Sequence, residues 1–122
     1  MARPTQLRKL VHSASLAGGG GVVQVDFDVL GYDYCTYIAR LNGTTTISDL
    51  TISNCKLFAL DENAPLVDIG IIFWENADAV QAVGGNIQLM RRVRVSGFSK
   101  IRATFTNVNA SAKVLEVWQF VA

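Results

Sequence analysis

Residues 25–32 read VDFDVLGY, and residues 91–98 read RRVRVSGF. In each stretch two apolar residues alternate with polar ones, and a glycine and an aromatic residue follow: Gly31-Tyr32 in the first, Gly97-Phe98 in the second. Apolar residues at every second position indicate a strand with one buried face. A glycine lets the chain turn sharply, and the ring after it can close the end of a core. The two stretches therefore predict two units, each made of a strand, a corner and a second strand.

The rest of the chain predicts an all-β protein around these units. Alternation and turn signals favour a single antiparallel β-sandwich, jelly-roll-like, with seven to eight strands. The pair Asn42-Gly43 is typical of a tight hairpin and predicts that the strands on either side of it are neighbours. The predicted strands are 22–30, 34–41, 44–52, 55–60, 66–74, 87–95, 99–106 and 113–121. The predicted core consists of Phe27, Val29, Tyr32, Val93, Val95, Phe98, Ile101 and Phe105.

Composition narrows the function. The chain has 122 residues, 50% of them apolar and only 17% charged, against a usual charged share of about 25%. This excess of apolar residues suggests a surface that another subunit covers. The net charge of +1 argues against a nucleic-acid partner, and no apolar run approaches the roughly 18 residues of a membrane span. The basic start lacks the apolar stretch of a secretory signal, so we expect synthesis in the cytosol.

The amino-terminal residues 1–21 differ from the remainder. We expect them to form an arm with a glycine-rich hinge at Gly18–Gly21, followed by the sandwich domain 22–122. A short helix is one alternative, because apolar residues recur at a helical spacing from Leu7 to Ala14. The other alternative is an edge strand of the chain's own sandwich.

No catalytic or metal-binding signature is present, so the sequence predicts no enzyme, no cofactor and no metal. Three weaker patterns stay open as alternatives. Asp26, Asp28 and Asp33 could converge on calcium. Arg92, Arg94 and Arg102 could line one phosphate-binding face or pair with Asp26 and Asp28. A sugar-binding platform would use Trp74, Trp118, Tyr34 and Tyr37. For Cys35 and Cys55, reduced core thiols and a disulfide both remain possible.

Two segments read as apolar on both faces, Leu66–Trp74 and the last strand. One face can meet the core, and the other needs a cover, either the arm or a neighbouring chain. The arm and these segments supply the predicted partner-binding residues: Leu7, Leu10, Val11 and Leu16, and Ile72, Trp74, Trp118 and Phe120.

The segments 13–33 and 93–112, which contain the two units, resemble small β-sandwich virion proteins of tailed bacteriophages, of the capsid decoration, head-fibre and tail-accessory kind. The likeness covers about two thirds of the chain and leaves residues 44–90 unmatched. It implies a non-enzymatic structural protein of the virion, assembled in the host cytoplasm. It further implies docking through the arm to other virion proteins, such as a major capsid protein, and self-association, with a trimer preferred. The alternative function is a carbohydrate-binding module.

Overall fold

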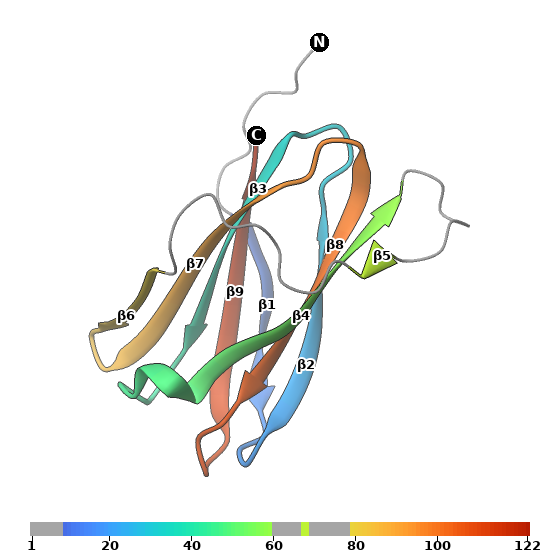
Figure 1. Ribbon diagram of the computed structural model, residues 1–122. Coiled ribbons are helices and arrows are strands. Elements are labelled where there is room, and N and C mark those ends of the chain that lie inside the picture. The colour runs from blue at the N-terminus through green and yellow to red at the C-terminus, as the bar shows by residue number, and fades with distance from the viewer. Residues whose placement is uncertain (1–8, 60–66, 69–78) are drawn as a thin grey trace.

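The two strand–corner–strand units lie side by side and form one bent antiparallel ladder in the computed structural model, which describes residues 9–59, 67–68 and 79–122 (Figure 1). The first unit contains β2 (Gly21–Asp28) and β3 (Tyr34–Leu41), and the second contains β7 (Asn86–Arg94) and β8 (Phe98–Asn107). β2 pairs with β8 and β3 pairs with β7, and in both ladders the numbers of paired residues add to 128. One register therefore runs through both units without interruption.

The bend in this ladder lies at the two glycine corners. The Val29 N–H donates to the Ser99 carbonyl at 3.0 Å, and the Val95 N–H donates to the Asp33 carbonyl at 2.7 Å. Gly31 and Gly97 have φ angles of 84° and 85°, in the left-handed region where glycine is favoured. The ring of Tyr32 is buried, and that of Phe98 packs partly buried against the core. The predicted corners are thus confirmed.

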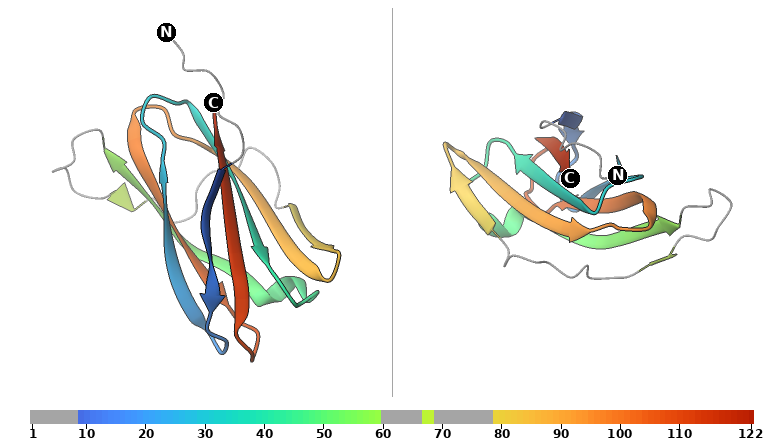
Figure 2. Two further views of the ribbon diagram at one scale, coloured as in Figure 1. Left: turned by 180° about the vertical axis from the view of Figure 1, so that it is seen from behind. Right: turned by 90° about the horizontal axis from the view of Figure 1, so that it is seen from above.

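Because each corner carries the chain from one layer to the other, the paired units build both sheets of a sandwich. Sheet A has the strand order β1-β9-β3-β7-β6, and sheet B has the order β2-β8-β4-β5. The two layers are seen from above in Figure 2. The remaining strands of the described residues are β1 (Lys9–Leu16), β4 (Leu50–Ala59), β5 (Val67–Asp68), β6 (Ala79–Val83) and β9 (Lys113–Val121). All pairings are antiparallel, and apart from β6 the order is that of a jelly roll, which confirms the predicted fold class.

The core between the two sheets contains the side chains that alternation assigned to it, and it also contains Tyr37, which the sequence did not assign to it. Phe27, Tyr37 and Phe105 are fully buried and link three strands, with ring centroids 5.0 Å apart for Phe27–Tyr37 and 6.0 Å for Tyr37–Phe105. All eight predicted core residues belong to this cluster, Phe98 as a partly buried member. Cys35 is also fully buried there, on β3, whereas Cys55 lies on β4 of the other sheet.

The hairpin predicted at Asn42-Gly43 is wrong. Gly43 does turn the chain, with φ at 85°, but the neighbours of β3 are β7 and β9. The turn is held by tertiary contacts: the Asn42 N–H donates to the Val114 carbonyl, and the Gly43 N–H to the Asn86 side chain. The chain then crosses to sheet B through a short 3-10 helix, Ile47–Asp49.

The predicted strands 44–52 and 55–60 correspond to one described strand, β4. It begins at Leu50, and its register against β8 shifts between Ile52 and Asn54, where a break between two strands was expected. Of the predicted strand 66–74, only Val67–Asp68 lies within the described residues. β6, which the sequence did not predict, pairs with β7 through the Gly84-Gly85 turn.

The expected arm is also corrected where the structure describes it. Lys9–Leu16 is strand β1, which pairs with β9 at the edge of sheet A, so this part realises the edge-strand alternative. Leu16 is buried in the core, and Val11 packs against it. The expected hinge, Gly18–Gly21, is a turn held by hydrogen bonds. The Gly19 N–H donates to the Asn109 carbonyl at 2.7 Å, and the Gly20 N–H donates to the Asn107 carbonyl at 2.9 Å. The sandwich therefore includes residues from Lys9 onward, and residues 1–8 lie outside the described part.

Candidate functional site: the outer face of sheet A

The outer face of sheet A carries a row of apolar side chains that crosses four strands. Leu10 of β1 is paired with Trp118 of β9, Trp118 with Ile38 of β3, and Ile38 with Met90 of β7. Directly paired residues of antiparallel strands place their side chains on the same face. Leu10 is 49% exposed and Met90 38%, whereas Ile38, on the central strand β3, is only 9% exposed. We call these four side chains the apolar row.

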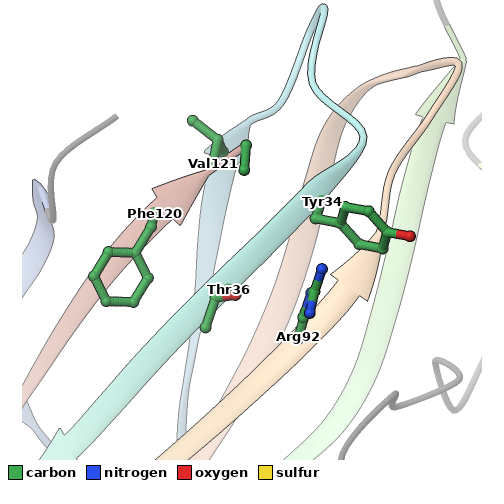
Figure 3. Close-up of a pocket in the computed structure, with 6 residues that line it drawn as sticks. Tyr34, Thr36, Arg92, Phe120 and Val121 are labelled. Carbon is green, nitrogen blue, oxygen red and sulfur yellow. The ribbon is translucent and has the colours of Figure 1, made fainter. Parts of the chain in front are cut away.

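A shallow pocket of about 250 Å³ lies beside the apolar row, toward the glycine corners (Figure 3). Thr36 of β3 is paired with Phe120 on one side and with Arg92 on the other. The Arg92 guanidinium lies over the Tyr34 ring, 4.1 Å from its centroid. The pocket is lined by Tyr34, Thr36, Arg92, Phe120, Val121 and Ala122.

A second stacked arginine lies at the opposite side of the apolar row. The Arg40 guanidinium is 5.0 Å from the centroid of the Trp118 ring and donates to the Gln88 side-chain oxygen at 3.1 Å. Its paired residue on β9 is Glu116, which accepts a hydrogen bond from the Asn42 amide at 2.7 Å. Arginine stacked on an aromatic ring is held in a fixed orientation and keeps its charge.

The outer face of sheet B differs in chemistry. Asp26 receives two hydrogen bonds from Arg102, at 2.8 and 3.2 Å, and lies 4.0 Å from the Lys100 ammonium. The hydrogen bond to Asp26 raises the pKa of Arg102. Farther along, Gln24 is paired with Thr104. Apart from Val22, which is 57% exposed, the described outward side chains of β2 and β8 are thus mainly charged or polar and suit contact with water.

The predicted partner-binding residues are distributed as follows. Trp118, Phe120 and Leu10 lie on the outer face of sheet A, although Leu10 does so as part of β1 and not of an arm. Leu16 faces the core, which corrects its assignment to a partner contact, and Val11 is partly buried against the core. Leu7, Ile72 and Trp74 lie outside the described residues.

Sequence reasoning missed Ile38, Met90, Arg40 and Arg92 as members of this face. These four residues lie in the alternating segments 34–41 and 86–94, but alternation within a segment does not predict which strands are neighbours. The face exists only because β1, β9, β3 and β7 are neighbours in sheet A.

The structure also bears on the arginine and calcium sites that the sequence left open. Arg102 lies on sheet B with Asp26, and Arg92 and Arg94 lie on sheet A, so a single arginine stripe is wrong. Among the described residues no group of three or more His, Cys, Asp and Glu side chains could hold a metal ion.

A sugar platform is weakened because Tyr37 is buried in the core. In addition, one ring face each of Tyr34 and Trp118 is occupied by a guanidinium. Trp74 lies outside the described residues.

Comparisons with known proteins identify no family for this chain. No protein-family model and no curated protein matches it. Among solved structures, the cryo-electron-microscopy structure of Broad Bean Stain Virus is similar with a TM-score of 0.40 and 14% identity, over 96% of this chain and 90% of that one. A similarity of this size carries no functional assignment. Within the described part of the chain, no helix has the length and apolar character that crossing a membrane requires.

Proposed function

We propose that this protein is a non-enzymatic structural component of a bacteriophage particle, of the capsid decoration or accessory kind. In this proposal it is located in the virion, assembles in the host cytoplasm and joins its particle through the outer face of sheet A. It contacts another virion protein, such as a major capsid protein, and associates with copies of itself, a trimer being the preferred state.

The observation that carries the proposal is the apolar row. Exposed Leu10 and Met90 flank Trp118 and Ile38 on one outer face. On the other outer face, the described side chains of β2 and β8 include the Asp26–Arg102 ion pair and polar residues, and one exposed apolar residue, Val22. Apolar surface that is concentrated on one face of a small protein favours contact with another protein. The resemblance of the two units to phage virion proteins supplies the class of assembly. Residues 1–8, including Leu7, remain part of the proposed docking region.

The test is the mass of the purified protein over a range of concentrations, alone and mixed with particles of the virus whose genome encodes it. Sedimentation should show oligomers, or co-sedimentation with the particle. The variant Leu10→Ser/Met90→Gln should lose this association while its thermal unfolding midpoint stays unchanged, because both side chains are exposed.

The matched control is Val22→Ser, which removes an apolar side chain that is 57% exposed on β2 of sheet B. This variant should associate like the wild type. A wild-type protein that stays monomeric at high concentration and does not bind its particle would contradict the proposal. So would equal association of the wild type and the Leu10/Met90 variant.

A further inference from the structure

The turn after β3 contains the only Asn-Gly pair of the sequence, Asn42-Gly43. In such a pair the backbone nitrogen of the glycine can attack the side-chain amide carbon of the asparagine, because glycine has no Cβ to hinder the approach. Gly43 is exposed and Asn42 is half-buried, so water reaches the turn. The turn lies at the end of sheet A where β3 ends and β7 and β9 begin (Figure 1).

Four hydrogen bonds from this pair tie the turn to β7 and β9, and we call them the Asn42 clamp. The Asn42 N–H donates to the Val114 carbonyl at 3.0 Å. The Asn42 Nδ2 donates to the Glu116 Oε1 at 2.7 Å and to the Val114 carbonyl at 3.2 Å. The Gly43 N–H donates to the Asn86 Oδ1 at 2.9 Å. The attacking nitrogen of Gly43 and the leaving nitrogen of Asn42 are therefore both hydrogen-bonded to distant strands.

We propose that Asn42 is a site of spontaneous deamidation, which the Asn42 clamp suppresses in the folded protein. In this reaction the Gly43 N–H gives its proton to a base in the solvent, and the nitrogen forms a bond to the Asn42 Cγ. The bond from Cγ to Nδ2 then breaks, and the amide nitrogen takes up a proton and leaves as ammonia. Water opens the resulting succinimide ring at either carbonyl, which leaves aspartate or isoaspartate at position 42. The reaction needs no partner protein, so it does not depend on the proposed function.

The clamp opposes both the ionisation of Gly43 and the attack on Asn42. Loss of the Gly43 proton would place a negative nitrogen 2.9 Å from the Asn86 oxygen, which carries partial negative charge, so ionisation is disfavoured. When Cγ becomes tetrahedral, Nδ2 leaves the amide plane, and its hydrogen bonds to Glu116 and Val114 break. Because these hydrogen bonds must be lost before ammonia leaves, the folded protein reacts slowly.

Deamidation also removes part of the clamp, because a carboxylate at position 42 has no N–H group to donate. It would lie at hydrogen-bond distance from the Glu116 carboxylate, and the two like charges repel. Asn42→Asp reproduces one product, and we expect it to lower the urea midpoint. Asn42→Asp/Glu116→Gln, compared with Glu116→Gln alone, should lose less, since the glutamine amide donates to the new aspartate.

The reaction is measured by incubating the full chain, folded and in guanidinium chloride, at one pH and temperature. Trypsin then releases residues 41–56, because the chain has Arg40 before this segment and Lys56 at its end. Fragmentation of this peptide in a mass spectrometer distinguishes deamidation of Asn42 from that of Asn54. The folded wild type should deamidate at Asn42 roughly tenfold or more slowly than the unfolded chain, since at least one hydrogen bond of ordinary strength must first break.

Two variants weaken the clamp at different atoms. Asn86→Ala removes the acceptor of the Gly43 N–H and should speed deamidation of the folded protein about three- to tenfold, the loss of one hydrogen bond. Asn86→Asp keeps an acceptor oxygen and should react no faster than the wild type. Glu116→Ala removes an acceptor of the Asn42 amide and should also speed the reaction, which keeps the test valid if Asn86→Ala does not fold.

Gly97→Ala is the control for stability. It strains the corner at the opposite end of β7, where φ is 85°, and leaves the clamp in place, so it should deamidate like the wild type. Equal rates in the folded and unfolded wild type would overturn the proposal. So would an acceleration by Gly97→Ala as large as that by the clamp variants, because global unfolding would then control the reaction.

Discussion

At the scale of single residues, the three rings of the core connect the two sheets. Phe27 and Phe105 come from sheet B, and Tyr37 comes from sheet A and contacts both. We expect Phe27→Ala and Phe105→Ala each to lower the free energy of unfolding by about 3–5 kcal/mol, because each leaves a cavity in a closed core. Urea unfolding measures this loss. Phe120→Ala, on the outer face, should cost much less, and a loss below about 1 kcal/mol at both core positions would contradict the assigned packing.

Asp49 gives the fold a dependence on pH. The Thr44 hydroxyl donates to it at 2.6 Å and the Asn109 amide at 2.8 Å, and these two hydrogen bonds lower the pKa of Asp49 from its ordinary 3.8. A carboxyl with a lowered pKa in the folded state stabilises the fold above its unfolded pKa, and this contribution disappears as the pH falls through the folded pKa.

We therefore expect the urea midpoint to fall between neutral pH and about pH 3, and Asp49→Asn to reduce that fall. The same midpoint measured for both proteins at both pH values tests this. An identical pH dependence in the variant would exclude Asp49 as its source.

At the scale of elements, Gly97 and Gly18 are required in their turns for different physical reasons. At Gly97 an added Cβ would meet nothing within 4 Å, so only the φ angle of +85° opposes substitution. We expect Gly97→Ala to cost about 1–2 kcal/mol. At Gly18 an added Cβ would lie 2.6 Å from the Ala110 carbonyl oxygen, so Gly18→Ala should cost more.

Thermal or urea unfolding of the two alanine variants gives the comparison. Gly97→Asn serves as a control, because asparagine tolerates the left-handed region better than alanine. A larger loss at Gly97 than at Gly18 would contradict this account.

Strand β1 determines which amino-terminal truncations are tolerated. Deleting residues 1–17 removes β1 and the buried Leu16, and it leaves one edge of β9 and part of the core uncovered. We expect that chain to unfold or aggregate, whereas deletion of residues 1–8 should leave the urea midpoint unchanged. Circular dichroism and urea unfolding of both truncations test this. A stable, folded chain without residues 1–17 would return the segment to the role of a separate arm.

At the scale of the whole molecule, the long bent ladder sets the folding rate. It pairs Gly21 with Asn107 and Leu41 with Ile87, residues that are far apart in sequence. Closing such pairs costs chain entropy before most contacts form, so we expect folding in milliseconds to seconds, typical of all-β sandwiches. Stopped-flow refolding measures the rate, and folding within microseconds would contradict a transition state that contains this ladder.

Much of the fold was predictable from the sequence because a strand's alternation is a local property. It identified the buried sides of β2, β7 and β8, and it located both corners, since a left-handed φ favours glycine wherever it occurs. It did not assign the faces of β3, where Tyr37 points into the core and Tyr34 does not. It also separated Trp118 and Phe120 from the core-facing residues of β9. The candidate site was predicted only to that extent.

Strand neighbours were decided by the tertiary structure alone. Asn42-Gly43 has the sequence of a hairpin, yet its backbone N–H groups donate to Val114 of β9 and Asn86 of β7, and no local pattern contains those partners. Strand β1 also depends on a distant partner. Its residues form a strand because they pair with the edge of β9. The apolar row also belongs to no single segment: four strands each contribute one side chain, and burial of the common core aligns them. Periodicity within a segment determined which way its side chains point, whereas the pairing that brings distant segments together depends on the apolar surface that the whole chain can bury.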